Sequence, residues 1–135
     1  MPRTEINYLA IVVAAILNMT IGFIWYGPAF GKTWLRLVGL RMENIDKTQV
    51  PKAYGLAFLA ALVMAYVLSA IVDLAQATTI VAGARTGFWV WLGFIVAGGA
   101  GRYLFPFKPL QLFMLDNTYQ LVVLAVTGAL FAVWI

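Results

Sequence analysis

The sequence contains no cysteine and no histidine, and only 10% of its 135 residues are charged. Without cysteine there is no disulfide, no thiolate chemistry and no iron–sulfur cluster, and without histidine the ordinary zinc and bis-imidazole haem sites lose their ligands. The chain also lacks a GxSxG nucleophile elbow, a phosphate-binding loop and a carboxylate pair at catalytic spacing. We therefore identify no catalytic residue and expect neither a metal nor a cofactor.

Hydrophobic residues, in contrast, make up 64% of the chain, against about 45–50% in soluble domains. The few polar residues cannot cover a soluble globule, which predicts a membrane protein. Four long runs are almost free of charge, and each is close to the ~20 residues that cross a ~30 Å hydrocarbon core. We predict one all-α domain with four transmembrane helices at residues 6–26, 53–72, 81–104 and 110–134.

The first of these runs raises the question of a signal peptide. It is longer than the about 7–15 residues of a signal-peptide core, and no small-x-small cleavage pattern follows it at a suitable place. We therefore expect the first span to be retained.

Lysine and arginine are concentrated on one side of the predicted topology. The loop between the first two spans carries five of them and the loop between the last two carries two, against two on the opposite side. By the positive-inside rule, both basic loops face the cytoplasm and both termini lie outside. The net charge of +4 then belongs to a rim beside the lipid headgroups, so we expect the lipid bilayer as a partner and no nucleic acid.

An aromatic segment, GFIWYGPAFGKTW, ends the first predicted span at residues 22–34. Amphipathic rings are favoured where a helix meets the headgroups, so we expect Trp25 and Tyr26 to anchor the span at the cytoplasmic interface. Gly27 and Pro28 end the helix, because proline lacks the N–H that an interior position donates. The apolar residues of 33–42 fall on one helical face, which predicts a short interfacial helix between the first two spans.

Two segments are specific enough to compare with known proteins: WYGPAFGKTW at 25–34 and PKA at 51–53. Together with GFWVWLGF and a last span that opens with LFMLDNTYQLV, they make nearly the whole chain resemble domain-of-unknown-function family 1761. The resemblance implies a small four-span bacterial membrane protein with no established activity. In that family position 27 is usually serine and the last span usually opens with Asn-Ala-Gly-Tyr-His. This chain has Gly27 and DNTYQ at 116–120, so no function that rests on the imidazole carries over.

Small residues recur every fourth position in three of the spans. Such stripes let helices approach closely in lipid, where association rests on van der Waals contact. We expect them to hold helices together, and because they offer more packing faces than one bundle requires, we expect a homo-oligomer. A separate pair, Gly83 and Gly87, indicates either close packing or a locally loosened helix. The stripes are Ala10, Ala14, Asn18 and Gly22; Ala53, Ala57, Ala61, Ala65 and Ser69; and Gly93, Ala97 and Gly101.

The candidate binding residues are the polar side chains within or beside the spans: Asn18, Arg102, Asp116, Asn117 and Tyr119. An amide or a carboxylate in hydrocarbon needs a partner. Asp116 either lies ~9 Å inside a helix that begins at residue 110, or caps a helix that begins at Asp116 itself. Arg102 either extends to the cytoplasmic face or pairs with Asp116. We predict that Asp116 faces the bundle and centres a polar site with Asn117 and Tyr119.

Three classes of function remain open. The first is an oligomeric channel or transporter for a small solute or ion, with a polar site near Asn18 and Asp116. The second is a non-catalytic accessory or assembly component of a larger membrane complex. The third, an intramembrane enzyme, would need a catalytic pair that the sequence does not show. A transporter predicts a water-accessible cavity that reaches Asp116 or Asn18, whereas an accessory component predicts co-purification with a larger complex.

Overall fold

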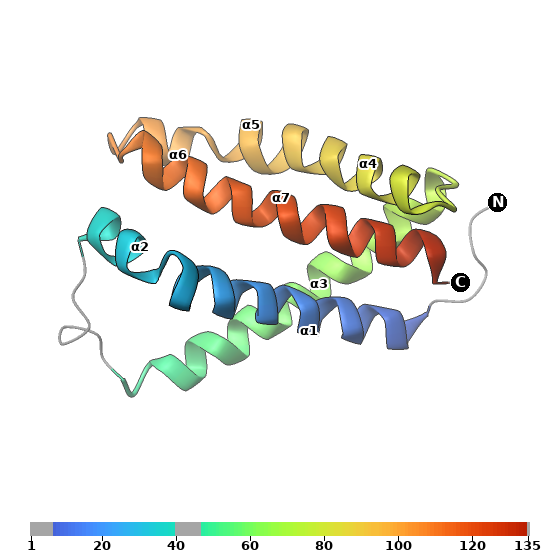
Figure 1. The fold of residues 1–135 in the computed structure, drawn as a ribbon, viewed down its shortest axis with the longest axis horizontal. Helices are drawn as coiled ribbons and strands as arrows, with labels where there is room; N and C mark the ends of the chain where they lie inside the picture. The colour runs from blue at the N-terminus through green and yellow to red at the C-terminus, as the bar shows by residue number, and fades with distance from the viewer. Residues whose placement is uncertain (1–6, 40–46, 135) are drawn as a thin grey trace.

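The computed structural model describes residues 7–39 and 47–134, which are helical for most of their length and include no strand (Figure 1). Two short segments interrupt the regular helices: η1 continues α1 into a kink at Gly27, and η3 continues α4 as a π-helical segment. The elements in order are α1 (Tyr8–Ile24), η1 (Trp25–Ala29), α2 (Gly31–Val38), α3 (Val50–Leu74), α4 (Ile80–Val90), η3 (Trp91–Val96), α5 (Ala97–Gly99), α6 (Gly101–Leu104) and α7 (Leu110–Val133).

Four helical stretches are long and apolar enough to cross a membrane. They are Tyr8–Ala29, Val50–Leu74, Ile80–Leu104 and Leu110–Val133, which confirms the all-α fold and the four predicted spans. Large apolar side chains such as Leu9, Phe94 and Leu110 point outward, as side chains that face lipid do. The chain is therefore a multi-pass membrane protein.

Most of the basic residues that the structure describes lie at one end of the bundle (Figure 1). We call it the basic end; it comprises η1, α2, the start of α3, α6 and the start of α7. The side of the membrane that this end faces remains a prediction. Arg85, near the start of α4, lies toward the other end. The basic residues of the basic end are Lys32, Arg36, Lys47, Lys52, Arg102 and Lys108.

Glycines bring α4 and α7 into close contact. A Cβ atom at Gly83 would overlap the carbonyl oxygen of Gly128, and one at Gly87 would overlap the carbonyl oxygen of Leu124. Helix backbones approach this closely in lipid only where side chains are absent or small. For Gly83 and Gly87 the sequence left two alternatives, close packing or a locally loosened helix, and the structure confirms close packing.

Only part of each small-residue stripe on the first two spans is buried in helix packing. On α1, Ala10, Ala14 and Asn18 are buried. On α3, Ala61, Ala65 and Ser69 are buried, whereas the earlier members, Ala53 and Ala57, are exposed. Figure 1 shows the reason, because the first half of α3 diverges from α5 and α6 toward the basic end.

The expected stripe on the third span is mostly exposed in a single chain, so its packing against a further copy stays a prediction. Gly93 and Ala97 are exposed, and no other part of the described chain lies within 4 Å of a Cβ placed at Gly93. The third span instead packs on α7 through Gly83 and Gly87, which lie on a different face of the helix. The spacing of small residues indicated two faces on the third span, and a single chain uses the one with Gly83 and Gly87.

The predicted interfacial helix is present as α2. Its basic residues Lys32 and Arg36 are exposed, and Trp34 and Leu37 are partly buried. The helix ends earlier than expected, because Gly39 has a φ of 76°, a left-handed conformation that glycine adopts readily. The rest of the predicted segment, residues 40–42, lies outside the described residues.

Apolar side chains of α1, α3 and α7 fill the half of the bundle opposite the basic end. Because these side chains are almost fully buried and, apart from Phe131, small or branched, they pack the three helices closely together. The polar side chains discussed next therefore lie toward the basic end. The core comprises Ala10, Ile11, Ala14, Ala65, Leu68, Val72, Leu124, Phe131 and Ala132.

Candidate functional site: a polar cavity at the basic end

The aromatic segment that follows α1 turns toward α7. At Gly27 the backbone leaves helical geometry, with φ −108° and ψ −105°, and Pro28 follows. The Nε1–H of Trp25 donates to the carbonyl oxygen of Leu115 at 3.2 Å, and the Tyr26 hydroxyl donates to Asp116 Oδ1 at 2.7 Å. Both side chains therefore make hydrogen bonds within the protein, and their role as anchors at the cytoplasmic interface stays a prediction.

Asp116 connects three segments of the chain. Because α7 begins at Leu110, the carboxylate lies six residues into the helix, which excludes its role as an N-cap. Tyr26 of η1 donates to Oδ1, and Tyr103 of α6 donates to Oδ2 at 2.8 Å. The predicted partners Asn117 and Tyr119 do not bond it, and Asp116 forms no ion pair with Arg102 among the described residues.

Two tyrosine hydroxyls are enough to keep a carboxylate at this depth. A charged side chain at the centre of a membrane helix costs roughly 2.5–3.5 kcal/mol on insertion scales. A hydrogen bond to a charged group contributes about 1.5–3 kcal/mol, so two such bonds are of the same size as the cost. Asp116 is thus stabilised by neutral donors from two other helical segments, not by a cation.

Tyr119 provides the partner that Asn18 needs. Its hydroxyl donates to Asn18 Oδ1, and Asn18 is only 8% exposed. The approach is close because Gly22, one turn further along α1, has no side chain; a Cβ there would lie 2.9 Å from the Tyr119 oxygen. The Tyr119 ring also packs edge-on against Tyr26, with 5.2 Å between the ring centroids. Tyr119 and Tyr26 thus join the Asn18 pair to the Asp116 pair.

The other two candidate residues behave differently. Asn117 is 7% exposed, and its Nδ2 donates to the carbonyl oxygen of Phe113 in the same helix at 2.6 Å. The backbone carbonyl oxygen of Asn117 accepts a hydrogen bond from Trp91 Nε1 at 2.7 Å, which links η3 to α7. Arg102 is exposed, and its guanidinium lies over Gly99, almost one turn back along the third span; its extension to the cytoplasmic face stays a prediction.

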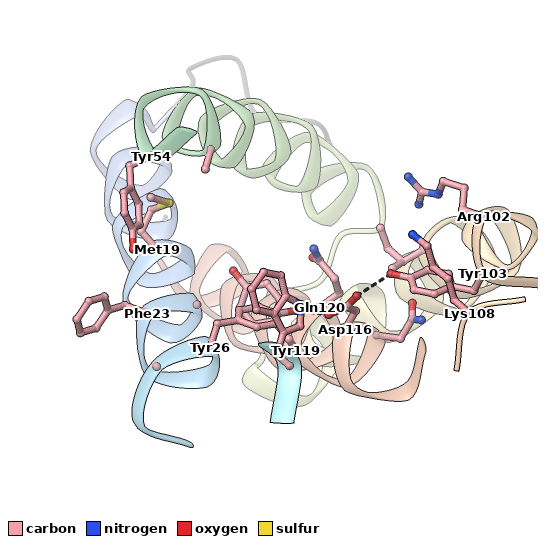
Figure 2. A pocket seen from close by; sticks show the side chains of 16 residues that line it. Met19, Phe23, Tyr26, Tyr54, Arg102, Tyr103, Lys108, Asp116, Tyr119 and Gln120 are labelled. Atoms are coloured by element: carbon pink, nitrogen blue, oxygen red, sulfur yellow. Dashed lines mark hydrogen bonds between the residues drawn. The ribbon is translucent and has the colours of Figure 1, made fainter. Parts of the chain in front are cut away.

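All these elements surround one cavity of about 830 Å³ (Figure 2). Its deepest residue on α7, Gln120, is ten residues from the helix start, or ~15 Å, about half of a ~30 Å hydrocarbon core. The π-helical segment η3 contributes Ile95 to the wall, as such segments often do at functional sites, and the kinked segment η1 contributes Tyr26 and Gly27. The lining residues are Met19, Gly22, Phe23, Tyr26, Gly27, Trp34, Tyr54, Ala57, Ile95, Arg102, Tyr103, Lys108, Asp116, Asn117, Tyr119 and Gln120.

Acidic and basic side chains line different parts of the cavity. Asp116 and Gln120 line its inner part, and the Gln120 Oε1 atom is buried without a hydrogen-bond partner in the described chain. Arg102 and Lys108 line the part near the turn between α6 and α7, where the Lys108 ammonium lies 5.5 Å from the centroid of the Tyr103 ring. Figure 2 shows the acidic and basic groups on one side of the cavity, with Met19, Phe23 and Tyr54 on the other.

Sequence reasoning missed Tyr26 and Tyr103 as parts of the site. Tyr26 was assigned to the lipid interface, and Tyr103 was overlooked beside the charged Arg102. The usable signal was chemical, since an embedded carboxylate needs donors and the tyrosines near the same membrane depth can supply them. Within residues 7–39 and 47–134, no group of three or more acidic side chains is arranged to hold a metal ion.

The fold and the cavity define a small multi-pass membrane protein with a polar chamber in one half of its bundle. Residues 9–132 match the family described as "Protein of unknown function (DUF1761)", and the chain belongs to that family. Comparison with curated proteins and with solved structures gave no match.

Proposed function

We propose that the protein is a small channel or transporter that takes up a small solute or ion in the cavity at the basic end, with Asp116 at its centre. The observation that carries the proposal is the cavity itself. Its volume of about 830 Å³ falls within the ~300–1,000 Å³ of ligand pockets. Ionisable groups at membrane depth, such as Asp116, commonly mark a solute pathway.

Polar side chains also line a second cavity next to the large one. A second, small cavity of about 10 Å³ is lined by Asn18 and Thr127 together with apolar residues. It is close to the size of one water molecule and lies on the far side of the hydrogen bond from Tyr119 to Asn18. Residues of the apolar core, such as Ala14 and Ala65, form the rest of its wall, and the core closes the bundle there. Transport therefore requires either a second conformation that opens the core or a further copy that completes the path.

Oligomerisation belongs to the same proposal. The exposed face of the third span carries Gly93, Ala97 and Gly98, and no other part of the described chain covers the two glycines. A small-residue face of this kind favours close packing of helices in lipid. In the proposed arrangement, copies associate in a bacterial inner membrane, with the basic end in the cytoplasm.

A second candidate function is a non-catalytic component of a larger membrane complex. The observation in its favour is that Tyr26 and Tyr103 already occupy both oxygens of Asp116. A carboxylate satisfied in this way also serves as a purely structural link between helices.

The absence of native cysteine allows a clean accessibility test. Met19→Cys and Gln120→Cys, both in the cavity wall, are expected to react with a membrane-impermeant thiol reagent applied from the basic end. Ala14→Cys and Ala65→Cys in the apolar core are the matched controls and are expected to stay unlabelled from that side.

Thiol labelling from the opposite side of the membrane distinguishes the two candidate functions. In a transporter, Ala65→Cys becomes reactive from the opposite side in at least part of the population, because the core must open during the cycle. Labelling of the cavity without any labelling of the core from either side supports the accessory role. Unreactive cysteines at both Met19 and Gln120 would refute a water-accessible cavity.

A further inference from the structure

The cavity presents hydrogen-bond acceptors in its inner part that the protein leaves incompletely used. An ionised carboxylate has about four lone-pair sites, and the hydroxyls of Tyr26 and Tyr103 use two of those on Asp116. Gln120 Oε1 is buried and has no partner in the described chain. A buried acceptor without a donor is unfavourable, so the inner part is suited to a ligand group that donates N–H bonds.

Aromatic rings make the same part of the cavity suitable for positive charge. Tyr26, Trp34 and Tyr119 also line the cavity, and the Tyr26 hydroxyl donates to Asp116. A cation near the face of an aromatic ring is attracted by the ring quadrupole, and the attraction grows when the site is shielded from water. A carboxylate, an unpaired amide oxygen and aromatic rings together favour an ammonium group.

The part of the cavity near the membrane surface has the opposite preference. Arg102 and Lys108 line it, and neither forms an ion pair within the described residues. Lys108 contacts the Tyr103 ring, which holds its ammonium beside the cavity. A guanidinium and an ammonium at one mouth favour an anionic group such as phosphate or carboxylate.

We propose that the cavity binds a small zwitterion, with its ammonium at Asp116 and Gln120 and its anionic group at Arg102 and Lys108. The proposal rests on the solute-binding function proposed above and names the class of the solute. A purely cationic ligand would leave the two basic residues uncompensated, and a purely anionic one would face Asp116. Only a ligand with both charges matches both ends.

A zwitterion of this kind is either a lipid headgroup or a free solute. The remaining wall is apolar, and its Phe23 and Tyr54 side chains are 66% and 52% exposed on the outside of the bundle. A headgroup carried by an acyl chain would place the chain along this wall, whereas a free solute would leave the wall to lipid. The ammonium and the anion are recognised in the same way in both cases.

The test is calorimetric titration of the purified protein in a non-ionic detergent. The probes are phosphoethanolamine, which carries both charges, and its two halves, ethanolamine and inorganic phosphate. Lysophosphatidylethanolamine and lysophosphatidylglycerol represent the lipid source with and without the ammonium. We expect a probe with both charges to bind at least tenfold more tightly than the matching probe with one.

Variants assign each charge of the probe to one end of the cavity. Asp116→Asn is expected to weaken zwitterion and ethanolamine binding at least tenfold without changing phosphate binding, and Lys108→Gln to weaken zwitterion and phosphate binding only. Gln120→Leu removes the unpaired acceptor but not the link to the tyrosines, so it replaces the first variant if Asp116→Asn fails to fold. Arg36→Gln, an exposed α2 residue outside the cavity wall, is the control and should change nothing.

The outcomes separate this inference from the function on which it rests. Binding of phosphoethanolamine supports a free zwitterion, and binding of lysophosphatidylethanolamine alone supports a headgroup. Equal affinity for ethanolamine and phosphoethanolamine, or no binding of any probe, overturns the zwitterion class. If Met19→Cys and Gln120→Cys are still labelled in that case, the solute-binding function stands. If the two cysteine variants are not labelled, the solute-binding function is refuted as well.

Discussion

Substitution of Gly87 by alanine tests whether α4 and α7 are held together by direct backbone contact. The new Cβ would overlap the Leu124 carbonyl oxygen and lie 2.7 Å from its carbonyl carbon and 3.2 Å from the Ala125 nitrogen. All three atoms belong to the backbone, so no change of rotamer relieves the overlap and the helices must separate. Overpacking of this kind costs about 1–3 kcal/mol, and a rigid neighbour places the cost in the upper part of that range, about 2–3 kcal/mol.

Helix propensity acts in the other direction, and a control removes it from the comparison. Alanine in place of a helical glycine contributes up to about 1 kcal/mol, so the net loss for Gly87→Ala is about 1–2 kcal/mol. Gly55→Ala in α3 receives the same gain without overlap, because no other part of the described chain lies within 4 Å of its added Cβ. The difference between the two variants is therefore the overlap itself, about 2–3 kcal/mol.

The assay is reversible unfolding in mixed micelles with a rising fraction of sodium dodecyl sulfate, followed by circular dichroism. Gly87→Ala is expected to unfold at a lower fraction than the unmodified protein, and Gly55→Ala at an equal or higher one. Equal midpoints for the two variants would refute the reasoning, because they would mean that α4 and α7 do not meet at the Leu124 backbone.

Three further predictions concern orientation, packing and the Asp116 link. A reporter enzyme that works only in the cytoplasm, fused after the last residue, should be inactive; activity would reverse the assigned orientation. Ala61→Leu, at a site that is 3% exposed, should lower the unfolding midpoint. Ala97→Leu should leave the midpoint unchanged and alter only the oligomer size in gel filtration. Equal destabilisation by both variants would contradict the packing described. Tyr26→Phe removes a donor to Asp116 and should cost about 1.5–3 kcal/mol in the same micelle assay, and no loss would show that the bond does not stabilise the fold.

The lipid solvent explains how much of the fold the sequence specifies. A segment that crosses hydrocarbon must be apolar for ~20 residues and must satisfy its backbone hydrogen bonds internally, so composition alone predicts four helices within a few residues of their bounds. The same reasoning singles out Asp116 and Asn18, because a polar side chain in hydrocarbon is costly enough to stand out from its neighbours.

What the sequence could not supply is the rotation of each helix and the partner of each polar group. A span that is apolar on all sides has no preferred face, so spacing indicated both Gly93 with Ala97 and Gly83 with Gly87. Only the structure shows that α4 meets α7 through the second pair.

Trp25 and Tyr26 were ambiguous for a related reason, since an amphipathic ring suits both a headgroup interface and an internal hydrogen bond. The donor to Asp116 Oδ1 comes from a residue 90 positions away in the chain. Only the turn at Gly27 and the packing of α1 against α7 bring the two together. The sequence by itself thus determined the membrane class, the spans and the residues that need partners, and the tertiary structure decided which partners they have, because pairing depends on helix rotation that an apolar solvent leaves unspecified.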